Sequence, residues 1–148
     1  MIVVERLMNK VRLLSLTVFL LLVTYGSRPT HAQVKRDSGA IERGRYIVES
    51  VAMCEQCHTQ RDGNGNLDRV HWLMGGPTQM RPSYTSPNWA TREPRIAGVP
   101  PGTDEEFVKL LTTGISRTGS PPNLPMPPFR MTRPDAEAVL AYLKSLNQ

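Results

Sequence analysis

The sequence predicts an all-α domain in which three main helices are joined by long, proline-rich loops. Three stretches repeat apolar residues at spacings of three and four, the period of a helix with one buried face. No alternating apolar run of useful length occurs between them, so little sheet is expected. Eleven of the thirteen prolines fall between Pro77 and Pro128, which places the loops in that part of the chain.

The first expected helix runs from about Ile41 into the only two cysteines. Its inward face is expected to hold residues at spacings of four, three and four, namely Ile47, Val51, Cys54 and His58. Tyr46 flanks that face.

The second expected helix lies in "TDEEFVKLLTTG", residues 103–114. Thr103 and Glu106 have the spacing of a capping box, and Gly114 suits a C-terminal stop. Its apolar stripe consists of Phe107, Leu110 and Leu111.

The third expected helix lies in "TRPDAEAVLAYLKSL", residues 132–146. Thr132 is the expected cap, and Pro134 falls in the first turn, where its missing N–H costs little. The apolar face is sustained over four turns by Ala136, Val139, Leu140, Leu143 and Leu146. This is the most regular of the three patterns.

The N-terminal part has the layout of a secretory signal. Basic residues precede an apolar run from Leu13 to Val23, and a polar stretch ends in small residues at Ala32. We therefore expect a signal peptide over 1–32, a flexible segment over 33–40 and one domain over 41–148. An uncleaved membrane anchor is the alternative for 1–32. Either way, the sequence favours a periplasmic or other extracytoplasmic location.

The charge of the chain does not point to nucleic acid. The whole sequence has a net charge of +5, but four of its 18 basic residues lie before residue 33. The remainder carries 14 basic and 12 acidic residues, interspersed along the chain. No basic stripe that could follow a phosphate backbone remains.

Cys54 and Cys57 are followed directly by His58 in "AMCEQCHTQ". A thioredoxin-like pair belongs at a helix N-terminus beside a strand, and zinc needs four ligands, which this chain supplies poorly. A plain disulfide gives His58 no role. A CxxCH motif, in contrast, gives all three residues a role, because the thiols join haem vinyl groups and the imidazole binds the iron. We therefore expect one covalent haem c.

Two segments together resemble class I c-type cytochromes: "GRYIVESVAMCEQCHT" and "PMPPFRMTRPDAEAVLAYLKSL". The chain is most similar to monohaem cytochromes and to cytochrome c subunits of bacterial periplasmic dehydrogenases, over residues 41–148. The resemblance implies that the first and last helices cross. Gly44 and Tyr46 would then meet the helix that carries Tyr142 and Leu143.

Met126, in "NLPMPPF", is the expected sixth ligand of the iron. Its loop is stiffened by flanking prolines, which reduces the entropy lost on holding the sulfur in place. Thioether ligation also raises the reduction potential, as suits an electron carrier. The resemblance places the axial methionine of the family at the same position. The alternatives are Met131, Met74, Met80 and His71, or an open site.

The loop over 59–102 has no motif that assigns individual roles. The side chains considered there as cover for the haem or as propionate partners are Trp72, Tyr84, Trp89, Arg61 and Arg95.

The expected function is one-electron transfer outside the cytoplasm, with redox partner proteins such as a periplasmic dehydrogenase or a terminal oxidase. The chain is not expected to be an enzyme by itself, because no nucleophile–base constellation or acid pair is evident. One alternative is a dedicated electron-transfer subunit of a periplasmic dehydrogenase complex. The others are a haem sensor or catalyst with a labile sixth ligand, and a structural protein with a disulfide and no haem.

Overall fold

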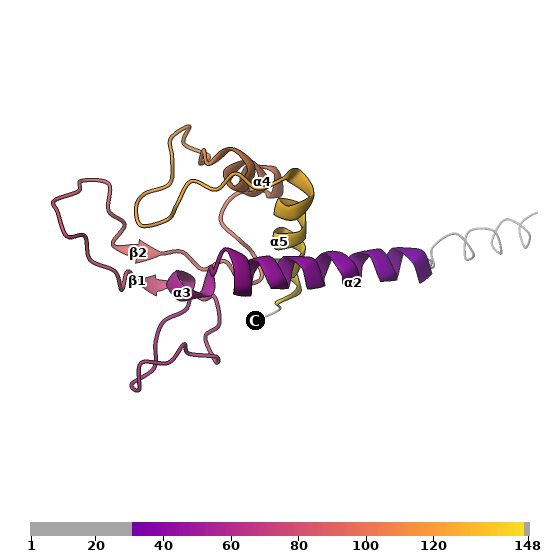
Figure 1. The fold of residues 1–148 in the computed structure, drawn as a ribbon, viewed down its shortest axis with the longest axis horizontal. Coiled ribbons are helices and arrows are strands. Elements are labelled where there is room, and N and C mark those ends of the chain that lie inside the picture. The colour runs from indigo at the N-terminus through magenta and orange to yellow at the C-terminus, as the bar shows by residue number, and fades with distance from the viewer. Residues whose placement is uncertain (1–30, 147–148) are drawn as a thin grey trace, which may run out of the picture. The chain divides into compact units, whose positions relative to one another are not determined.

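The computed structural model describes residues 31–146, with side chains from Ser38 onward. Residues 36–148 group into one compact unit, and the account below concerns its described part. Its elements are helical apart from one short strand pair (Figure 1): α2 His31–Tyr46, the π-helical turn η1 Ile47–Val51, α3 Glu55–His58, β1 Gly76–Pro77, β2 Arg92–Glu93, α4 Asp104–Thr113 and α5 Arg133–Ser145. The expectation of a mainly helical domain with little sheet is confirmed.

The first helix differs from its prediction at both ends. It begins at His31, so the segment 33–40, which was expected to be flexible, lies within α2. At its C-terminal end the helix widens into η1 and stops before the cysteines. Two hydrogen bonds that span more residues than an α-helical bond close this end. The N–H of Ala52 donates to the Ile47 carbonyl at 2.8 Å, and the N–H of Cys54 donates to the Val48 carbonyl at 2.9 Å.

The wider turn shifts the phase of the helix. Ile47 and Val48 are buried, whereas Val51 is 57% exposed, so the prediction that Val51 faces inward is wrong. Regular 3.6-residue spacing placed Val51 on the buried stripe, and a π-helical turn advances each residue less around the axis.

The two C-terminal helices begin and end where the sequence predicts. Thr103 accepts the N–H of Glu106 while the Glu106 carboxylate accepts the N–H of Thr103, which makes a full capping box for α4. Gly114 ends α4 in the left-handed conformation at φ 64°. Thr132 caps α5, with a proline in its first turn.

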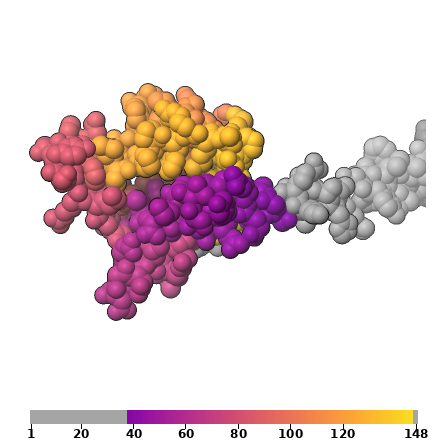
Figure 2. Space-filling view, in the orientation of Figure 1, coloured from indigo at the N-terminus to yellow at the C-terminus, as the bar shows by residue number. Residues whose placement is uncertain are grey.

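The core lies where α4, α5 and η1 meet, and Figure 2 shows the C-terminal segment beside α2. In α4, Phe107, Val108 and Leu111 are buried, and Leu110 is half-buried. The buried residues of α5 are Ala136, Ala138, Val139, Leu140, Tyr142 and Leu143. Most of this face was expected, because a sustained helical period leaves one choice of inward face.

Gly44 meets α5, as expected, whereas Tyr46 lies largely in solvent. A Cβ on Gly44 would lie 1.9 Å from the Ala138 carbonyl oxygen and 2.8 Å from the Cβ of Tyr142. Tyr46 is 54% exposed, and the Arg43 guanidinium lies 5.7 Å from its ring centroid. The π-turn that follows Tyr46 aims Ile47 and Val48 at the core in its place.

None of the helices within residues 31–146 is long and apolar enough to cross a membrane. The expected signal peptide or anchor over 1–32 falls almost entirely outside the described residues.

Candidate functional site

A cavity of about 1030 Å³ lies beside the CxxCH motif. Cys54, Cys57 and His58 line one part of its wall, and the loop that carries Met126 lines another. Residues separated by most of the domain in sequence are thus brought to one space.

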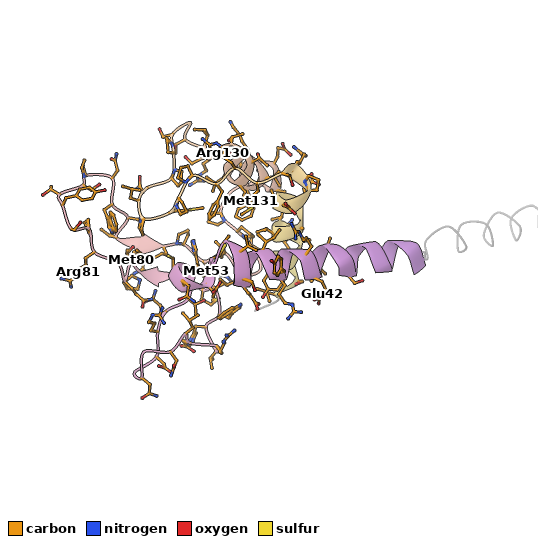
Figure 3. All side chains as sticks on the ribbon, viewed as in Figure 1. Glu42, Met53, Met80, Arg81, Arg130 and Met131 are labelled. Carbon is orange, nitrogen blue, oxygen red and sulfur yellow. The ribbon has the colours of Figure 1, made fainter. Side chains whose placement is uncertain are left out.

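The cysteines do not end a long helix, as the sequence suggested, but lie at and within a helix of their own. Met53 interrupts the chain with φ 49°, a left-handed conformation that is uncommon for a residue other than glycine. Cys54 is then the N-cap of α3, and Cys57 and His58 lie within its single turn. Met53 thus separates η1 from α3, and Figure 3 labels it at this point.

His58 is fixed by the segment that follows β2. Its Nδ1–H donates to the carbonyl oxygen of Pro94 at 2.8 Å, which leaves Nε2 with a free lone pair. Burial lowers the pKa of His58, although this hydrogen bond and the charge of Glu93 act in the opposite direction. The ring is therefore a neutral imidazole of defined tautomer, the form that binds metals.

Gly75 makes this contact with Pro94 possible. Its N–H donates to the His58 carbonyl at 2.8 Å, and its φ is 68°. A Cβ there would lie 2.4 Å from the Glu93 carbonyl oxygen and 2.5 Å from the carbonyl carbon of Pro94. Sequence reasoning gave Gly75 no role. The adjacent glycines of "GGPT" were the available signal for a close backbone approach.

The environment of the thiols is unlike that of a redox-active pair. Both cysteines are free. Burial, followed by the charge of Glu55, raises the pKa of Cys54 to about 12. Burial also raises the pKa of Cys57, with smaller effects from Glu93 and Glu55. A disulfide oxidoreductase needs a lowered thiol pKa, so the start of α3 does not supply that chemistry.

The wall of the cavity is mostly apolar, and its rim is polar. Its large apolar side chains come from both C-terminal helices and two loops: Ile96, Phe107, Leu110, Leu111, Phe129, Val139 and Leu143. Arg92 and Arg117 are its cationic residues. A flat apolar group with a charged edge would find partners for both parts here.

The residues proposed from the loop over 59–102 do not line this cavity. Trp89 donates its indole N–H to the Met80 carbonyl at 3.0 Å, and Trp72 is buried beneath the Arg69 guanidinium. Arg61 bonds Gln56 and the Gly65 carbonyl. Tyr84 and Arg95 are likewise absent from the lining. Because the loop contains no periodic pattern, its polar residues could not be ranked from the sequence.

Of the candidates for a sixth ligand, Met126 is on the cavity wall and the others are not. Met131 lines a second, smaller cavity of about 270 Å³, between α2 and the loop before α5. His71 is exposed and bonds Asp68 at 2.7 Å. Met74 is half-buried elsewhere, and Met80 is 52% exposed on the loop that follows β1 (Figure 3).

The comparison with known proteins gives one informative match, to part of the chain. A segment of 36 residues, 24% of this chain, is 56% identical to a protein of Cereibacter sphaeroides described as "Diheme cytochrome c-type". The match supports a cytochrome c. It spans about 12% of the length of that relative. No family model matches the chain.

The residues of the cavity fit the group that such a relationship implies. Haem c needs two thiols, a neutral imidazole with a free nitrogen, apolar walls and polar groups at one edge. Cys54, Cys57 and His58 supply the first two requirements, and the helices and the rim supply the others.

Proposed function

We propose that the chain is an extracytoplasmic one-electron carrier with one covalent haem c. The observation that carries this proposal is that one cavity is lined by Cys54, Cys57 and His58 and also by Met126. Bound haem supplies one-electron chemistry at its iron. The protein supplies attachment, axial ligands and a low-dielectric surrounding.

Cys54 and Cys57 attach the group. Each would hold it through a thioether, in which the sulfur bonds to one carbon of a vinyl group and the thiol hydrogen goes to the other carbon. This attachment uses two free thiols and not a disulfide. The raised pKa values of both cysteines keep their sulfurs in the S–H form near neutral pH. The chain has no further cysteine, which limits thioether attachment to one haem.

His58 and Met126 are the proposed axial ligands. The bond to Pro94 holds Nε2 of His58 as the metal-binding nitrogen and makes it more basic. The Met126 loop is stiffened by Pro125, Pro127 and Pro128, and the N–H of Met126 closes a turn onto the Asn123 carbonyl at 3.2 Å. A His/Met pair favours a high reduction potential.

The apolar wall of the cavity adds a physical reason for covalent attachment. Without a bound group, the apolar side chains of that wall would face water, which is unfavourable. A group that fills the space and cannot dissociate keeps them covered permanently.

The first experiment is expression with the c-type maturation machinery, followed by visible spectra and acid–acetone extraction. We expect haem that remains with the protein after extraction. Replacement of both Cys54 and Cys57 by alanine should release it into the solvent, whereas Met80→Ala, which changes a side chain outside the cavity, should retain it. A wild-type protein without haem would contradict the proposal and favour a structural protein.

Two further measurements separate the alternatives within this class. Stable co-purification with a flavin-, quinone- or molybdenum-containing protein would identify a dehydrogenase subunit. Rapid carbon monoxide binding to the native reduced protein would identify a sensor with a labile sixth ligand. A carrier that meets its partners transiently, across a small interface, should show neither property.

A further inference from the structure

Glu93 is a carboxylate in an unusual place. Glu93 is the last residue of β2 and is only 8% exposed. It lines the cavity, and its Oε2 finds no hydrogen-bond donor among the described residues. Arg92, the preceding residue, also lines the cavity, but it is exposed. It gives no hydrogen bond to the Oε2 of Glu93.

A buried, unpaired carboxylate is costly unless a compensating charge lies near it. The segment beyond Glu93 continues directly into Pro94, whose carbonyl bonds His58. Glu93 thus lies on the side of the cavity where the proposed proximal ligand is held.

From this placement we infer that Glu93 is a potential-setting residue: as an anion in the haem cavity it stabilises ferric over ferrous iron and lowers the reduction potential. The inference rests on the proposed function. Reduction adds one electron to the iron, supplied by the donor protein, and breaks no bond in Glu93. The carboxylate favours the oxidised form because that form carries one more positive charge.

The effect opposes that of Met126. Thioether ligation raises the potential, and a buried anion near the iron lowers it. The chain would therefore work at a potential below that of the same His/Met pair in a cavity without an internal anion. Its electron donors and acceptors would then be couples of correspondingly lower potential.

Glu55 offers a matched control. It is 5% exposed, lies between the two cysteines and also has an Oε2 without a donor among the described residues. It differs in two respects, because it does not line the cavity and its Oε1 accepts a bond from Gln56 at 3.1 Å. Glu55→Gln therefore removes an equally buried acid from outside the cavity.

The test is a mediated redox titration, at pH 8, of the haem-loaded wild type, Glu93→Gln and Glu55→Gln. We expect Glu93→Gln to raise the equilibrium constant for reduction at least tenfold, which is about 59 mV for one electron. Glu55→Gln should give less than half of that shift. If Glu93→Gln binds too little haem, Glu93→Leu takes its place, because it also removes the charge and needs no buried hydrogen bond.

The outcomes separate the two levels of the argument. A wild type that keeps no haem after extraction overturns the proposed function and this inference with it. Haem-loaded variants at the wild-type potential overturn the role of Glu93 alone, as would an equal rise in Glu55→Gln. A rise in Glu93→Gln with an unchanged spectrum supports an electrostatic role, because a structural change would also alter the ligand bands.

Discussion

The backbone of Gly44 in α2 lies directly against the carbonyl oxygen of Ala138 in α5, at a separation that leaves no space for a Cβ atom. An added methyl group would lie 1.9 Å from that oxygen. The first and last helices of the domain are therefore held together at a point where only glycine is accommodated. Beyond this point, Ile47 and Val48 enter the core.

Gly44→Ala should destabilise the haem-loaded protein by about 1–3 kcal/mol, because the helices must separate to admit the methyl group. Chemical denaturation followed by circular dichroism measures this change. Gly39→Ala in the same helix is the control, since a Cβ there would have nothing within 4 Å. It should be neutral or slightly stabilising, by up to about 1 kcal/mol, because alanine favours a helix. Equal effects of the two variants would contradict close packing at Gly44.

Gly75→Ala should loosen the hydrogen bond between His58 and Pro94. The substitution adds a Cβ 2.4 Å from the Glu93 carbonyl oxygen at a residue with positive φ, so β2 must shift. A weaker bond makes Nε2 less basic, and the ferric form loses some stabilisation. We expect a higher reduction potential, with lower stability. Gly63→Ala is the control, because a Cβ there meets nothing within 4 Å, and it should leave the reduction potential unchanged. An equal change of potential in Gly63→Ala would contradict the explanation through the His58–Pro94 hydrogen bond.

Met126→Ala should abolish the weak red absorption band of ferric iron bound to methionine sulfur and should lower the potential, because an open or water-filled site favours ferric iron. Met131→Ala should retain the band, because Met131 lines the second cavity instead. Visible spectra of both oxidised variants check this. Retention of the band in Met126→Ala and its loss in Met131→Ala would show that Met131, and not Met126, is the sixth ligand.

Tyr142 should make the stability of the protein fall in alkali. Burial, together with its hydrogen bond to Glu49, raises its pKa from 10.0 to about 12. Because the folded pKa is the higher one, this contribution is complete below pH 10 and is lost as the pH rises through 12. Unfolding free energies at pH 8 and 11 should therefore differ less in Tyr142→Phe than in the wild type. An identical pH dependence in both proteins would show that Tyr142 contributes nothing to it.

The sequence predicted the local features of the fold well, because each depends on neighbouring residues. The capping box of Thr103, the stop at Gly114 and the cap at Thr132 are short-range signals, and all three are confirmed. The end of the first helix was wrong because a π-helical turn and the positive φ of Met53 leave no periodic trace. Residues of the cavity rim, such as Arg117, carried no local signal either.

The sequence by itself determined which chemistry we propose for this protein. The chain order alone shows Cys54, Cys57 and His58 in a CxxCH motif and Met126 between prolines. This spacing points to haem without any knowledge of the fold. Only the tertiary structure decided which groups surround that chemistry. Three of these groups come from a loop without periodicity. They are the Pro94 carbonyl that orients His58, Gly75, which allows the close approach of that backbone, and the buried Glu93. Their proximity depends on long-range packing, which local sequence patterns do not encode.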